Sequence, residues 1–279
     1  MMPPATQEKL VDQATRPGHD APVMVETATR QDTIEALLKK SKRDGTVGIR
    51  QAFLQRGRGS KAGAGPLATF VKKSDAVALD AYLLLLLLGR GKRYGGHYVT
   101  VQAGTWVRAL GLAGPSSGQR LSRALFRLEA MRLIRRARTR KGVRIELLKE
   151  DGGGRPYTPP AGSEPDLYFR LPFDYWAEDR YLSLRMPAKA MLLVALGEAP
   201  EFELPVSKVK DYYGFSQETA QRGLEELVRA QIARFDMRIV KDALDPDGQR
   251  QAKFWHLLGP YARAQKESVE VVRRIRRIK

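Results

Sequence analysis

The chain has 279 residues, with 49 Lys and Arg against 31 Asp and Glu, and it contains no cysteine. The lack of cysteine excludes disulfides, thiolate catalysis and cysteine-based zinc fingers. At about 150 residues per domain the length suggests two domains, and 43% hydrophobic residues supply a substantial core. The net charge of +18 favours a polyanionic partner, most often nucleic acid and less often an anionic membrane.

The positive charge is concentrated in one part of the chain. Residues 39–73 carry +9 and residues 74–150 carry +10, whereas residues 151–272 are slightly acidic at −3. A block of this kind indicates where a polyanion would be held.

Residues 1–66 are expected to form a disordered tail followed by a basic arm. The first residues lack the apolar stretch of a secretory signal, so we expect a cytoplasmic, nucleoid-associated protein. A short helix is predicted over 32–40. The Gly- and Arg-rich stretch after it predicts a flexible cationic arm over 39–61, with Arg56, Arg58 and Lys61 as phosphate contacts. Its Arg-Gly-Arg segment resembles an AT-hook without the usual proline, which favours non-specific binding.

The basic stretch 67–150 predicts a first domain. Ser74 or Asp75 begins a helix that runs through six leucines to Leu88 and is too short to span a membrane. A strand (97–102), a short helix (105–110), a helix (119–134) and a hairpin (135–139 and 143–148) are expected after it.

Residues 151–166 hold four glycines and four prolines, which predicts a linker. A second domain is expected over 167–260, with the same order of elements: helices at 186–196, 206–213 and 216–230, a short strand at 203–205, and hairpin strands at 232–241 and 252–258. Residues 261–279 predict a basic C-terminal helix. Partner docking, phosphate contact and membrane-surface binding are its possible roles, in that order.

The predicted fold class is therefore α+β, mainly helical with small β-hairpins, built as two tandem winged-helix domains. In each, a helix-turn-helix is followed by a β-hairpin wing.

The helix at 119–134 is the predicted DNA reader of the first domain. Leu121, Leu125 and Leu128 form its core stripe, and the arginines cluster on the opposite face. Arginine pairs with guanine and glutamine with adenine in the major groove, while the hairpin would bind phosphates or the minor groove. The candidate DNA contacts of this domain are Ser117, Gln119, Arg120, Arg123, Arg127, Arg135, Arg136, Arg138, Arg140, Lys141 and Arg144.

An ordinary solvated face of salt-bridged arginines is the competing interpretation. It is disfavoured because Glu129 is the only acid between Asp80 and Glu146. In the second domain the candidate readers are Gln217, Thr219, Gln221 and Arg222, but the surroundings are acidic. DNA contact and protein binding are equally open there.

No catalytic or metal-binding pattern is recognisable. Three histidines stand in unrelated contexts, and the glycine-rich stretches lack a phosphate-binding loop. Asp174, Glu178 and Asp179 are better explained as surface acids than as metal ligands. We expect a non-enzyme without cofactors.

The chain resembles the RepA-like plasmid replication initiators, which carry tandem winged helices. Residues 181–191 (YLSLRMPAKAM) and 215–224 (FSQETAQRGL) carry the likeness, which covers residues 67–260 in element order. The resemblance implies binding to repeated origin sites, with one domain also able to dimerise.

The sequence thus predicts a sequence-specific double-stranded DNA-binding protein, either a replication initiator or a transcriptional regulator. Replication or transcription proteins, or a second copy, are possible partners through the second domain or the C-terminal helix. The alternative is a non-specific RNA-binding or structural chromatin protein.

Overall fold

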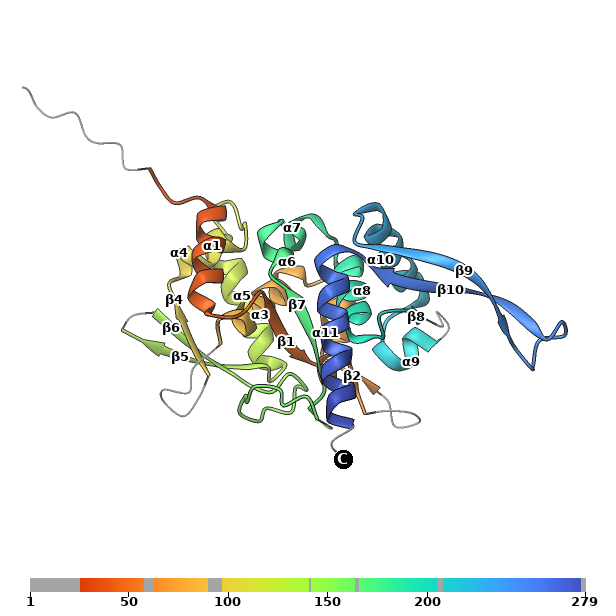
Figure 1. The fold of residues 1–279 in the computed structure, drawn as a ribbon. Helices are drawn as coiled ribbons and strands as arrows, with labels where there is room; N and C mark the ends of the chain where they lie inside the picture. The colour runs from red at the N-terminus through yellow and green to blue at the C-terminus, as the bar shows by residue number, and fades with distance from the viewer. Residues whose placement is uncertain are drawn as a thin grey trace, which may run out of the picture.

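A computed structural model describes residues 26–57, 63–89, 97–140, 142–163, 166–204 and 208–276. The fold is α+β, with helices packed around small antiparallel sheets (Figure 1). One contiguous hydrophobic core runs through these residues. None of the helices within the described ranges combines the length and apolar character needed to cross a bilayer.

The predicted order of helix, strand, helix, helix, strand, strand occurs twice. The first unit contains α3 (Ala76–Leu88), β4 (Tyr98–Val101), α4 (Ala103–Ala109), α5 (Ser117–Ala130), β5 (Ile134–Thr139) and β6 (Gly142–Leu147). The second contains α8 (Met186–Gly197), β8 (Phe202–Glu203), α9 (Val209–Tyr213), α10 (Gln217–Arg229), β9 (Ala233–Lys241) and β10 (Gln249–Leu257). Their sheets also match, because the last strand is central in both: β4-β6-β5 and β8-β10-β9.

Local signals explain where these helices begin and end. The Asp75 side chain accepts a hydrogen bond from the Ala78 backbone and caps α3, and Ser216 caps α10 in the same way through Thr219. Gly214 ends α9 at φ 75°, a left-handed conformation that suits glycine. The leucine run is buried on every side from Leu83 to Leu87.

The first helices of the two units are joined through a buried polar cluster. Asp80 of α3 forms an ion pair with Lys189 of α8, and the Tyr175 hydroxyl donates to Asp80 at 2.8 Å. Burial raises the pKa of Asp80, although Lys189 and Tyr175 both act to lower it. Removing one partner of such a buried pair would leave an uncompensated charge.

Residues before the first unit are ordered, so the prediction of a flexible arm from residue 39 is wrong for residues 39–57. They form α1 (Arg30–Ser41), β1 (Thr46–Arg50), a 3₁₀ turn η1 (Gln51–Phe53) and β2 (Gln55–Arg56), which pairs with β3 (Gly63–Ala64) ahead of α2 (Leu67–Lys72). Arg43 donates to the carbonyls of Leu86 and Leu87 at the end of α3, where a cation is favourable. Residues 1–25 and 58–62 lie outside the described residues.

Strand β1 pairs antiparallel with β7 (Tyr168–Pro172), which precedes the second unit. Side chains along a strand point alternately to its two faces, so every second residue of each strand faces the core. These buried residues are Val47 and Ile49 of β1 and Phe169 and Leu171 of β7. The short helices α6 (Asp174–Ala177) and α7 (Arg180–Ser183) follow β7. The C-terminal helix α11 (Gly259–Arg276) packs on β7 and α8 (Figure 1), and Gln265 donates to the carbonyl of Ala195 in the last turn of α8 and to that of Ala199 just after it.

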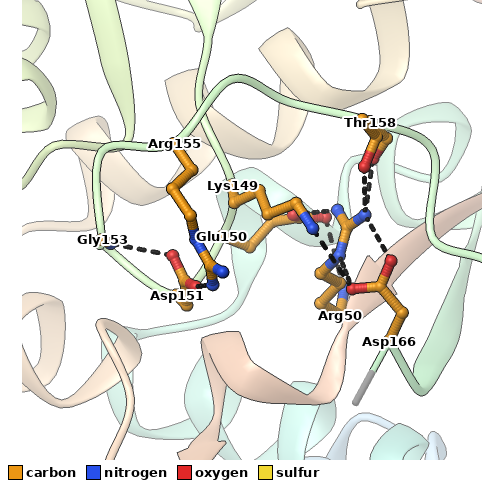
Figure 2. A network of polar contacts seen from close by, with 8 residues as sticks. All are labelled: Arg50, Lys149, Glu150, Asp151, Gly153, Arg155, Thr158 and Asp166. Carbon is orange, nitrogen blue, oxygen red and sulfur yellow. Dashed lines mark hydrogen bonds and ion pairs between the residues drawn. The ribbon is translucent and has the colours of Figure 1, made fainter. Parts of the chain in front are cut away.

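The segment 151–166, predicted as a linker, is an ordered loop across its described residues. Buried Arg50 of β1 forms ion pairs with Glu150 and Asp166 and donates to the Thr158 carbonyl at 2.6 Å (Figure 2). The hydrogen bond from Arg50 holds the pKa of Asp166 below its usual value. Burial raises the pKa of Glu150, because desolvation outweighs the attraction of Arg50. Arg50 therefore ties the N-terminal strand β1 to both ends and the middle of this loop.

Candidate nucleic-acid interface

Helix α5 separates an apolar face from a cationic one. Leu121, Ala124, Leu125 and Leu128 are buried and the helix packs against α3. Gln119, Arg120 and Arg123 are exposed on the other side, as the sequence predicts, and Ser117 is half-buried at the first position. Neither arginine has an ion pair or hydrogen bond within the described part of the chain, so their guanidinium groups are available to a ligand.

Arg127, which the sequence predicts as a DNA contact, is held in an ion pair within the protein. Its Nη2 donates to Asp75 Oδ1 at 2.8 Å and its Nε bonds the other carboxylate oxygen. The pair joins α5 to the residue that caps α3. The expectation that these arginines lack acidic partners is therefore wrong for Arg127, because its partner Asp75 lies 52 residues earlier in the sequence, before the interval that contains few acids.

The β5–β6 hairpin uses some of its cations internally. Arg136 pairs with Glu129 at 2.7 Å and Arg135 with Glu146 at 3.1 Å, while the Arg144 guanidinium lies 3.5 Å from the centre of the Tyr98 ring. Burial acts to raise the pKa of Glu129, but hydrogen bonds from Arg136 hold it below the usual value. The Arg136–Glu129 pair thus joins the hairpin to α5.

Two hairpin arginines have no such contacts. Arg138 and Arg140 are exposed and have no ionic or hydrogen-bond partner among the residues that the structure describes. Arg138 lies two residues beyond Arg136 and so points to the same side of the strand, the side on which Arg136 meets α5. The cationic face of α5 therefore continues onto the hairpin. Lys141 lies outside the described residues.

Phe126 is a residue that the sequence analysis missed. It is 63% exposed on α5 and its ring lies 5.7 Å from the Arg136 guanidinium. With Arg123 and Arg127 it lines a shallow hollow of about 380 Å³. The signal was available, because Phe126 falls outside the leucine stripe of the helix. An exposed ring among arginines suits apolar contact with a thymine methyl group or a sugar.

The remaining arm residues do not join this face among the described residues. Arg56 is exposed in β2 and lines a separate hollow with Lys149 and Arg155, and Arg58 and Lys61 lie outside the described residues.

In the second unit, α10 presents a mixed-charge face. Gln217, Gln221 and Arg222 are exposed and Thr219 is half-buried. Gln221 donates to Glu225 at 3.0 Å, and Arg222 lies 3.7 Å from Glu218. The acids thus engage two of the four expected readers. Tyr213 and Phe215 are buried at the preceding turn and belong to the hydrophobic core.

A groove of about 720 Å³ lies between α10 and the β9–β10 hairpin. Leu224, Val228, Phe235 and Trp255 supply its apolar walls, and acids and bases of both signs line its rim. This unit therefore exposes a more apolar and less cationic surface than the first.

The described residues offer no cluster of three or more potential metal-ligating side chains. Asp179, one of the acids considered, pairs with Arg30 of α1. Tyr157 and Tyr175 are buried, and burial raises the pKa of Tyr157 to about 12.

Comparison with known proteins finds no matching family model, no matching curated protein and no matching solved structure.

Proposed function

We propose that the chain is a tandem winged-helix protein that binds double-stranded DNA in a sequence-dependent manner, as a replication initiator or a transcriptional regulator. The first unit places α5 in the major groove and lays the β5–β6 hairpin on the adjacent backbone. It acts by binding and not by catalysis.

The observation that carries the proposal is the set of exposed arginines left unpaired while their neighbours are paired. Arg120 and Arg123 project from α5, and Arg138 and Arg140 from the hairpin, in a region with a net charge of +10. The neighbouring pair Arg127–Asp75 fixes α5 to the start of α3, and the pair Arg136–Glu129 fixes α5 to the hairpin. Free cations on a rigid frame can meet phosphates and base edges at set positions.

The repeated element order supports the proposed fold. A helix-turn-helix followed by a β-hairpin is the winged-helix order, and α4, α5 and the β5–β6 hairpin stand in that order. The second helix of such a motif enters the major groove with its N-terminal residues at the bases. Gln119, Arg120 and Arg123 occupy that part of α5.

Selection of bound fragments from random duplex DNA tests the proposal. We expect an enriched motif whose affinity falls with salt, because phosphate contacts release counterions. Directly repeated sites would favour the initiator role and an inverted repeat the regulator role. If no motif is enriched and single-stranded RNA competes as well as duplex DNA, the proposal fails and the non-specific alternative holds.

A further inference from the structure

Strand β9 exposes an apolar stripe along an open sheet edge. In the sheet order β8-β10-β9, β9 has a strand neighbour on one side alone within the described residues. Phe235, Met237 and Ile239 lie on one face of the strand and are 40%, 52% and 68% exposed. The hairpin projects away from the body of the molecule (Figure 1). Long, exposed and apolar strand edges readily pair with another strand.

The sequence of β9 is complementary to itself when two copies run antiparallel about Met237. In that register Met237 faces its own copy and Phe235 faces Ile239, which joins the apolar stripes of both chains. On the opposite face Asp236 lies across from Arg238, twice by symmetry. Apolar and opposite-charge cross-strand pairs both stabilise a sheet.

Neighbouring registers lack this complementarity. A two-fold axis centred on Asp236 places two aspartates opposite each other and sets Arg234 across from Arg238. An axis centred on Arg238 places two arginines opposite each other. Like charges directly opposite destabilise a strand pair, so the charges favour the register centred on Met237 over these two.

We propose that β9 is a homodimer interface, in which two copies of the chain join their three-stranded sheets across a two-fold axis at Met237. The symmetry makes the contact isologous and closed, so that it yields dimers and not filaments. Each apolar stripe then continues into the groove lined by Trp255 and Leu224 of its own chain. The inference does not depend on DNA binding, and its test contains no DNA.

Sedimentation equilibrium of the full chain across the micromolar range measures the association. We expect a mass twice that of the monomer. Asp236→Arg and Arg238→Asp should each give monomers, because each sets like charges opposite in its own homodimer. An equimolar mixture of the two variants should restore dimers, because the arginine introduced in one chain then meets the aspartate introduced in the other, and the native pair forms alongside. A monomeric wild type, or a mixture that stays monomeric although circular dichroism shows both variants folded, overturns the proposal.

A cysteine cross-link tests the register independently of charge. The chain has no cysteine, so Met237→Cys introduces a single thiol at the proposed axis. Facing residues of antiparallel strands have Cα atoms about 4.5 to 5.5 Å apart, within disulfide range. We expect nearly complete cross-linking under mild oxidation. Lys253→Cys is the matched control, because it lies beside Met237 on β10 and its copies would be three strand spacings, about 14 Å, apart. Equal cross-linking of both variants, or none of Met237→Cys, contradicts the proposed register.

Discussion

The unpaired arginines of the hairpin and of α5 should affect binding in different ways. Replacing Arg138 and Arg140 by alanine removes two phosphate contacts if the hairpin lies on the backbone. Each phosphate contact contributes about 0.9 to the slope of log Kobs against log salt. The double variant should therefore lower the slope by about 2 and weaken all DNA sequences alike. Between about 50 and 200 mM salt, the affinity gap to the wild type should narrow roughly tenfold.

Replacing Arg120 and Arg123 by alanine should instead reduce discrimination. Base contacts of this kind are worth about 1 to 3 kcal/mol each against the wrong base, so the ratio of specific to non-specific affinity should fall at least tenfold. Fluorescence anisotropy with a selected fragment and a scrambled fragment measures both ratio and slope.

Arg222→Ala with Arg229→Ala is the matched control, since it removes the same charge from the equivalent helix α10. The control should change the slope little, because Arg222 lies beside Glu218 and Arg229 lies on the α10 groove with Glu225. If the two first-unit variants leave both quantities unchanged, or if the control lowers the slope as much as the hairpin variant, the assignment of the first unit as the reader is refuted.

Three further predictions concern stability. Arg127→Ala should lower the free energy of unfolding, measured by urea titration, by about 1 kcal/mol, the upper end for a part-exposed ion pair. It should cause little loss of DNA discrimination, because Arg127 is held by Asp75. A loss of discrimination as large as that of the Arg120 and Arg123 double variant would contradict this. Arg50→Met should lower the free energy of unfolding by about 3 to 5 kcal/mol, because it leaves Glu150 buried and unpaired. Adding Glu150→Gln should restore part of that free energy, and a double variant as unstable as the single one would show that the unpaired charge is not the cause. The pKa of Asp166 is lowered in the folded state, so its contribution to the free energy of unfolding is present above the ordinary aspartate pKa of about 3.9 and is lost as the pH falls through the folded-state pKa. Asp166→Asn should therefore reduce the loss of stability on acidification. The same loss of stability at low pH in the variant and the wild type would contradict this role of Asp166.

The repeated units could be predicted because their signals are local. Asp75 and Ser216 mark helix starts by hydrogen bonds to backbone groups three residues away, and glycine after α9 marks its end. Alternating and helical periodicities depend on a few neighbouring residues in the same way. The exposed face of α5 followed from the same periodicity.

The long-range contacts could not be predicted in this way. Strand β1 lies in a stretch whose Arg and Gly content resembles a flexible arm, and its partner β7 follows a segment rich in Gly and Pro. The one local signal for this strand pair is the two-residue spacing of apolar side chains, Val47 and Ile49 in β1 and Phe169 and Leu171 in β7. The ion pairs of Arg127 and Arg50 bring together residues 52 and 100 positions apart, for which composition and spacing carry no signal.

The pairing of β1 with β7 has a consequence for synthesis of the chain. Ile49 and Phe169 face each other although 120 residues separate them. At about 5 to 20 residues per second, the ribosome needs roughly 6 to 24 s to deliver the second strand after the first. Throughout that interval β1 lacks its partner strand and Arg50 lacks Asp166, and the whole first unit is synthesised before the interval ends. The N-terminal segment therefore reaches its native state only once the chain has been translated past β7, which makes a nascent chain stalled before that point prone to pair through β1 with other strands.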